Sequence, residues 1–260
     1  MGAVTAKFKR EVEKLRTAEA VASVASLVAP GFMDGRDVAR DRAFLATGLF
    51  YEHNWTADGP ISKAARAQFE RDMLADLAAY VDPLQSDALA AVAARVARTG
   101  ADERHLVFNP LSWTRTDVAD LSTAVTPPLR VIDVATGVEV PSQVMPGSPV
   151  KVRILAADVP SVGYRVYAVR PGAGASFPPS ATIASPSFDN GIYAVRLGAR
   201  GNIVSLIDHK DGNRELVDAT AGGSIHDLGS GNGAVTVESS GPVSTTLLVV
   251  AGGSPRTRRG

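Results

Sequence analysis

The feature that most constrains the fold of this 260-residue chain is an abrupt change in composition near Gly100. Residues 1–100 contain 23 alanines, 6 glycines and 3 prolines, whereas residues 101–260 contain the other 18 glycines and 13 prolines. Alanine-rich sequence with few prolines favours helices, and glycine and proline at short intervals favour short strands and turns. The sequence therefore predicts a multidomain α and β chain, in which an N-terminal helical bundle precedes an antiparallel β-sandwich region.

The first half is expected to form four helices. Apolar residues that recur in steps of three and four predict helices over residues 8–25, 36–49, 61–80 and 86–96. Pro30 ends the first helix, and Pro60 suits the first turn of the third. Pro83 is expected to separate the third helix from the fourth, with Ser86 as the N-cap of the fourth.

The second half is interpreted as short strands separated by turns. Residues 191–197 and 202–207 predict a hairpin, and residues 171–187, rich in Pro, Ala, Ser and Gly, predict a linker between two β modules. A final strand over residues 243–250 has no expected return partner, which predicts an open edge and an incomplete sandwich. The predicted domains are a helical domain (1–100), a small β domain (101–182) and the start of a truncated C-terminal sandwich (183–260).

Charge and cysteine content exclude several functional classes. The chain has 27 basic and 27 acidic residues, so we expect neither nucleic-acid nor membrane-surface binding. It has no cysteine, which excludes disulfides and thiolate zinc sites. Residues 1–10 are not followed by the apolar run of a signal peptide, and residues 20–33 are too short and too interrupted to span a bilayer. We therefore expect a cytoplasmic protein.

The segment with most chemical potential is residues 51–60, YEHNWTADGP. His53 could bind a metal through its imidazole, and an exposed Trp55 could stack on a sugar ring. The structural alternative is that His53 is a capping or packing residue, since a metal site needs three or four ligands and His53 supplies one. The remaining histidines (His105, His209 and His226) are expected to be structural.

The order of several segments resembles glycoside hydrolase family 38, the α-mannosidases. The resemblance covers roughly residues 7–250. Its motifs are FYEHNWTADGP, LVFNPLSWTRTDVADL, ILAADVPSVGYRVYAV and FDNGIYAVRLGARGNIVSLIDHKDGNREL.

This resemblance implies a retaining α-mannosidase that removes terminal α-mannosyl residues and holds a zinc ion at the sugar. The family's N-terminal barrel, which carries the nucleophile and the acid/base, has no counterpart here, so no catalytic residue is assigned to this chain. The resemblance implies that His53, within Glu52-His53-Asn54-Trp55, is one zinc ligand. It implies that Trp55 and Asp58 line the sugar pocket.

The same resemblance predicts that this chain is a fragment, inactive alone, whose partners are mannose-containing carbohydrate and the barrel. Helical surface that normally packs on the barrel is then expected to expose apolar side chains. Two alternatives stay open. One is a carbohydrate-binding β-sandwich, with Trp113 as its stacking platform. The other is a non-catalytic scaffold, in which replacing His53 changes nothing.

Overall fold

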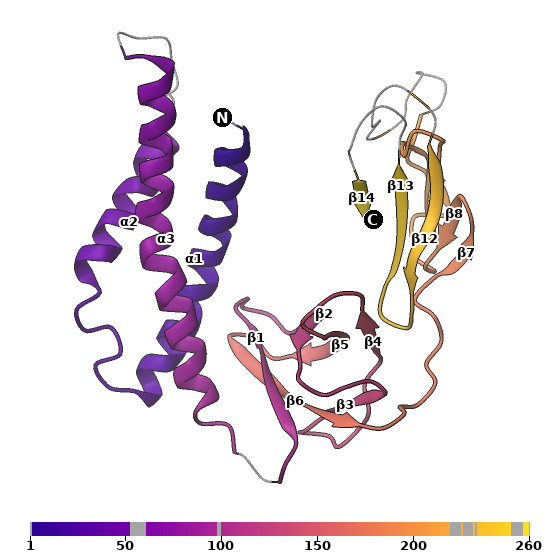
Figure 1. Ribbon diagram of the computed structural model, residues 1–260, viewed down its shortest axis with the longest axis horizontal. Helices are drawn as coiled ribbons and strands as arrows, with labels where there is room; N and C mark the ends of the chain where they lie inside the picture. Colours follow the sequence, from indigo (N-terminus) through magenta and orange to yellow (C-terminus); the bar gives the residue numbers. More distant parts are fainter. Residues whose placement is uncertain are drawn as a thin grey trace. The chain divides into compact units, whose positions relative to one another are not determined.

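The computed structural model describes residues 2–52, 61–97, 100–218 and 233–250, with Ile225, Gly231 and the backbone of residues 257–259 (Figure 1). Helices come first and antiparallel sheets follow, which confirms the predicted fold class. The contacts divide the chain into two units, residues 1–116 with 157–166 and residues 117–156 with 167–260. Among the described helices, none combines the length and the apolar character needed to cross a bilayer.

Three helices build the first unit: α1 (Gly2–Val28), α2 (Asp37–Phe50) and α3 (Lys63–Ala93). The predicted end of the first helix before Pro30 and the predicted second helix are both confirmed. Small alanines on α1 and α2 and larger side chains on α3 bury one shared core. Its most enclosed members are Phe8, Val21, Leu77, Val81 and Leu84.

The predicted break at Pro83 is wrong, because α3 continues through this residue. The buried stripe of Leu77, Leu84 and Ala88 runs across the proline without interruption, and its packing outweighs the lost hydrogen bond. Because Pro83 has no N–H, the Ala79 carbonyl lacks its usual helical hydrogen bond. Both residues are exposed, so water can bind this carbonyl. Ser86, the predicted N-cap, consequently lies inside the helix.

Two three-stranded sheets follow the helices. One has the order β2 (Arg115–Ser122), β5 (Lys151–Val159), β4 (Ser142–Met145). The other has the order β1 (Glu103–Asn109), β6 (Gly163–Pro171), β3 (Leu129–Asp133). Alternating side chains on β3 and in the first part of β5 are buried, as expected for strands with one face on a core.

A five-stranded antiparallel sheet comes next along the chain. Its order is β11 (Arg214–Glu215), β10 (Ile203–Asp208), β9 (Tyr193–Leu197), β8 (Ser187–Asp189), β7 (Thr182–Ala184). The predicted hairpin over residues 191–207 is confirmed as β9 and β10. The predicted linker is partly wrong, because residues 182–184 form β7 and residue 187 begins β8.

The last sheet has the order β12 (Ala234–Ser240), β13 (Thr245–Val250), β14 (Thr257–Arg259). The expected open edge at residues 243–250 is wrong, since β13 is the central strand and pairs with β12 and β14. Both pairings are antiparallel. The strand β14 is thus the return partner that the sequence did not predict.

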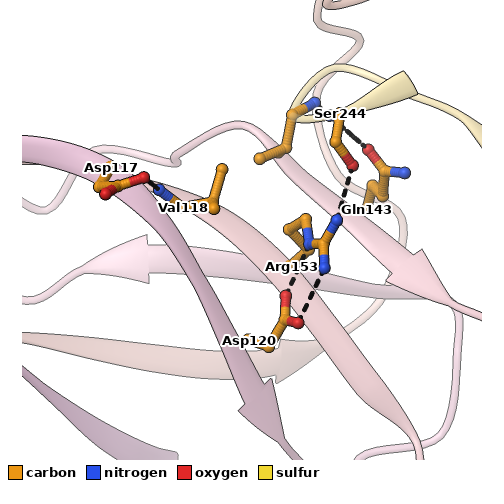
Figure 2. Close-up of polar contacts among 7 residues, drawn as sticks. Asp117, Val118, Asp120, Gln143, Arg153 and Ser244 are labelled. Atoms are coloured by element: carbon orange, nitrogen blue, oxygen red, sulfur yellow. Dashed lines mark hydrogen bonds and ion pairs between the residues drawn. The ribbon is translucent and has the colours of Figure 1, made fainter. Parts of the chain in front are cut away.

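The turn between β12 and β13 is fixed to the β2-β5-β4 sheet within the second unit (Figure 2). The Gln143 side-chain oxygen on β4 accepts hydrogen bonds from the Ser244 amide at 3.0 Å and the Val243 amide at 3.3 Å. Arg153 on β5 donates to the Ser244 hydroxyl at 3.1 Å. A single turn is thus held by partners from two strands.

Arg153 is itself held in a two-pronged ion pair (Figure 2). Its Nε and Nη2 atoms donate to the two carboxylate oxygens of Asp120 on β2 at 2.7 Å and 2.9 Å. Hydrogen bonding from Arg153 holds the pKa of the Asp120 carboxyl below its ordinary value. Such a planar pair fixes the guanidinium in one orientation, which leaves Nη1 directed at Ser244.

Candidate functional site

The predicted site residues His53, Trp55 and Asp58 lie outside the described residues. The described structure places the elements on either side of them. Before the segment, α2 ends at Phe50, and the Tyr51 amide is bonded to the Thr47 carbonyl at 3.4 Å. After it, the Ser62 hydroxyl accepts a hydrogen bond from the Ala65 amide at 3.2 Å and caps α3.

An aromatic cluster anchors the end of α2 next to this segment. The rings of Phe8 and Phe50 stack with centroids 3.7 Å apart, and Tyr51 meets both rings edge-on at 5.9 Å and 5.8 Å. Phe8 comes from α1 and is fully buried. The last turn of α2 is therefore packed against α1 immediately before residue 52.

The described residues do not supply a metal site. Among them, His, Asp and Glu never gather in a group of three or more that could hold an ion. The implied zinc would need three or four ligands, and the described part does not fit it.

The structure does contain a hollow of about 340 Å³ over the five-stranded sheet. Residues directly opposite each other in antiparallel strands present side chains to the same face. The register therefore places two rows of side chains on one face of the sheet. We call the hollow over these two rows the sheet hollow. The first row is Ala184, Ser187, Arg196 and Ser205, and the second is Thr182, Asp189, Ala194, Ile207 and Glu215.

Asp189 is the anchored acceptor of the sheet hollow. Its carboxylate accepts from the Gly191 amide at 2.7 Å and from His209 Nε2 at 2.9 Å. The Gly191 amide, followed by His209, holds the pKa of Asp189 below its ordinary value. His209 Nδ1 lies 2.6 Å from the Asn213 side-chain oxygen, and this contact, with Asp189, raises the pKa of His209. Asp189 is therefore ionised and oriented at neutral pH.

Glu215 is a second anchored carboxylate at the margin of the sheet hollow. It accepts from the Ser205 hydroxyl at 2.5 Å, the Leu206 amide at 2.8 Å and the Val217 amide at 2.9 Å. These bonds, the Ser205 bond first, lower the pKa of Glu215 to about 2. Its lone pairs are largely occupied by the protein.

Arg196 is the cation of the sheet hollow. It is exposed, and its guanidinium has no hydrogen-bond or ion-pair partner among the described residues. Its neighbours in the same row are Ser187 and Ser205, from the two flanking strands. The five N–H donors of Arg196 are consequently presented to solvent, beside the small side chains of the first row.

Two other residues considered in the sequence lie in the first unit. His105 Nε2 is 2.7 Å from a Glu103 carboxylate oxygen, beside a cavity of about 60 Å³ that is too small for an organic ligand. Trp113 is 60% exposed, and its carbonyl accepts from the Asn109 side-chain amide at 2.7 Å. Its backbone is therefore fixed while its ring faces solvent.

Sequence reasoning missed the contact between Asp189 and His209. Each residue lies beside a turn rich in Asp, Asn and Gly, and His209 was expected to be structural. The two turns meet because β8 pairs with β9 and β9 pairs with β10. The local signal was present, but the pairing that joins the turns depends on a register that local sequence does not reveal.

Comparison with known proteins gives a likeness to solved structures but none to known sequences. No protein-family model and no curated protein sequence matches this chain. Among solved structures, the fold is similar to that of an α-mannosidase from Enterococcus faecalis V583, with a TM-score of 0.69 and 14% sequence identity. The match covers 95% of this chain and 34% of that one, so this chain spans about a third of that enzyme's length. The chain therefore has a fold related to part of a glycosidase.

Proposed function

We propose that this chain is the central and C-terminal portion of a retaining α-mannosidase that hydrolyses terminal α-mannosyl residues of glycans or oligosaccharides. The observation that supports the proposal is the likeness over 95% of the chain to a segment of an α-mannosidase. The sequence resemblance to glycoside hydrolase family 38 supports it independently, since it was based on motifs rather than on the fold.

In this proposal the catalytic carboxylates lie on a barrel domain outside these 260 residues. Retaining glycosidases need a nucleophile and an acid/base on opposite sides of the scissile bond. The anchored carboxylates Asp189 and Glu215 hold hydrogen bonds within this unit, and neither is proposed as a nucleophile or an acid/base. The isolated chain is therefore expected to be inactive.

The outer face of α2 suits contact with such a barrel. Val38, Phe44 and Leu45 are 74%, 52% and 64% exposed. Exposed apolar side chains gathered on one helix face are typical of an interaction surface. We propose that this face packs against the barrel, as the sequence resemblance implied.

We also propose that His53 supplies one zinc ligand to the assembled enzyme, with Trp55 and Asp58 near the bound sugar. The supporting observation is the packed end of α2, where Phe8, Phe50 and Tyr51 contact one another immediately before this segment.

The deciding experiment recovers the coding sequence on both sides of this chain and assays the longest reading frame with an aryl α-mannoside. We expect a frame that encodes a barrel, hydrolysis with retention of configuration, and no hydrolysis by the 260 residues alone. In the longer protein, His53→Ala should lower zinc content, whereas His105→Ala should not. Hydrolysis by the 260 residues alone, or adjacent sequence without a barrel, would overturn the proposal.

A carbohydrate-binding role is a second candidate, because the Trp113 ring is exposed on a fixed backbone. An exposed indole offers a flat apolar face to a sugar ring. Trp113→Ala should then abolish retention of the whole chain on a mannan column. Unchanged retention would remove Trp113 as the platform.

A further inference from the structure

We propose that the sheet hollow is a binding site for a single neutral saccharide ring. The proposal is based on the geometry of the five-stranded sheet and does not depend on the α-mannosidase proposal. It concerns binding only.

The hollow is formed by the sizes of the side chains along its two rows. Ala194 lies in the second row between Asp189 and Ile207, and Ala184 ends the first row. These short side chains leave empty space above the sheet, and the longer side chains of Arg196 and Ile207 lie beside that space. The resulting volume of about 340 Å³ is at the small end of ligand pockets, which suits one ring rather than an extended chain.

The polar groups of the hollow match a ring that carries several hydroxyls. A sugar hydroxyl both donates and accepts. The Asp189 carboxylate, held by Gly191 and His209, can accept further hydrogen bonds from hydroxyls, since it has about four lone-pair sites. The unpartnered Arg196 guanidinium can donate to ring or hydroxyl oxygens, and Ile207 offers an apolar contact to the C–H face of the ring.

The balance of charge distinguishes a neutral ring from other ligands. A phosphate or carboxylate at Arg196 would lie on a face that also carries the carboxylates of Asp189 and Glu215. A cation drawn to those carboxylates would meet the Arg196 charge. A purely apolar ligand would cover Asp189 and Arg196 without satisfying them, which is unfavourable. A polyhydroxylated neutral ligand satisfies both groups.

The test uses the full chain and amide-resolved NMR titration with methyl α-D-mannopyranoside, methyl α-D-glucopyranoside and methyl α-D-galactopyranoside, with inorganic phosphate as the charged probe. We expect at least one glycoside to bind in the millimolar range and to shift amide signals of β8, β9 and β10. Phosphate should bind at least tenfold more weakly.

Variants locate the site. Arg196→Met removes the free donors and Ala194→Leu fills the empty space above the sheet, and each should weaken glycoside binding at least tenfold. Arg214→Met is the matched control, because Arg214 on β11 pairs with Asp211 at 3.0 Å and does not line the hollow. Circular dichroism of each variant confirms folding. If Ala194→Leu does not fold, the glycoside affinity of Arg196→Met alone tests the site.

Several outcomes would overturn the inference. They are the absence of shifts with all three glycosides, tighter binding of phosphate, or equal glycoside binding by Arg196→Met and Arg214→Met. None of these bears on hydrolysis by a longer enzyme. Equally, failure of the α-mannosidase proposal would leave a positive titration unchanged, so the two failures are distinguishable.

Discussion

At the scale of single residues, Gly241 in the second unit leaves no room for a side chain. A Cβ atom there would lie 2.6 Å from the Gln143 side-chain oxygen and 2.7 Å from its Cδ. That oxygen accepts the hydrogen bonds from Val243 and Ser244 that hold the β12–β13 turn. A methyl group at residue 241 would therefore displace the group that fixes the turn.

Gly241→Ala should lower the free energy of unfolding by about 1–3 kcal/mol, the usual effect of overpacking. Gly48→Ala is the matched control. An added Cβ at Gly48 meets nothing within 4 Å, and the residue is inside α2, so alanine should stabilise by about 0.5–1 kcal/mol. Urea unfolding of both variants checks the two signs.

The double variant Gly241→Ala with Gln143→Ala tests the cause. Removing the glutamine side chain creates room for the new methyl group, so the two substitutions should be less harmful together than the sum of their separate effects. Strict additivity would show that the clash with Gln143 is not what destabilises Gly241→Ala.

Glu215 predicts a pH dependence at acidic pH. Its pKa is lowered from 4.5 to about 2 by bonds that exist only in the folded chain. A depressed carboxyl pKa gives stability that is complete above the unfolded pKa and is lost as pH falls through the folded one. Between about pH 4.5 and pH 2, Glu215→Gln should therefore lose less stability per pH unit than the parent. Urea midpoints at pH 5, 4 and 3 measure this, and parallel curves would contradict it.

At the scale of elements, α3 keeps a proline that its own packing does not require. Pro83 is exposed within a 31-residue helix, where it removes one backbone hydrogen bond. Pro83→Ala should raise the free energy of unfolding by about 1–2 kcal/mol, after allowing for the greater freedom of the unfolded chain. Thermal and urea unfolding test this. A loss of stability would mean that the packing of the buried stripe depends on Pro83.

Elements with a strong local pattern were predictable from sequence. α1 and α2 follow the three-to-four spacing of their apolar residues, and the β9–β10 hairpin follows its turn. The continuity of α3 was not predictable from sequence, because the tertiary burial of Leu77 and Leu84 outweighs the local tendency of Pro83 to end a helix. β7 was hidden because a three-residue strand beside Pro186 has the composition of a linker.

Of the two candidate sites, one was predicted from the sequence and the other was not. The segment with His53, Trp55 and Asp58 was selected from residue chemistry, and it lies outside the described residues, so these assignments stay predictions. The sheet hollow was not predicted, since it brings Asp189, Ala194 and Ile207 together from three strands. Such a surface depends on register, which follows from long-range pairing.

At the scale of the whole molecule, the two units are expected to unfold with some independence. Leu77 is fully buried in the helical core, so Leu77→Ala should cost about 2–5 kcal/mol there. Hydrogen exchange should accelerate at amides of α1, α2 and α3 and stay unchanged in β9, β10 and β13. Leu45→Ala, at a 64% exposed position on α2, is the control and should change neither set. Acceleration in both units would indicate one cooperative block.

The chain passes between its two units three times, after residues 116, 156 and 166. Breaking any one peptide bond would therefore leave at least one unit assembled from two separate polypeptides. A gene rearrangement that transfers a contiguous stretch cannot pass on either unit intact without carrying part of the other. This segment is expected to have been inherited as a whole, and protein engineers who wish to graft it should exchange both units together.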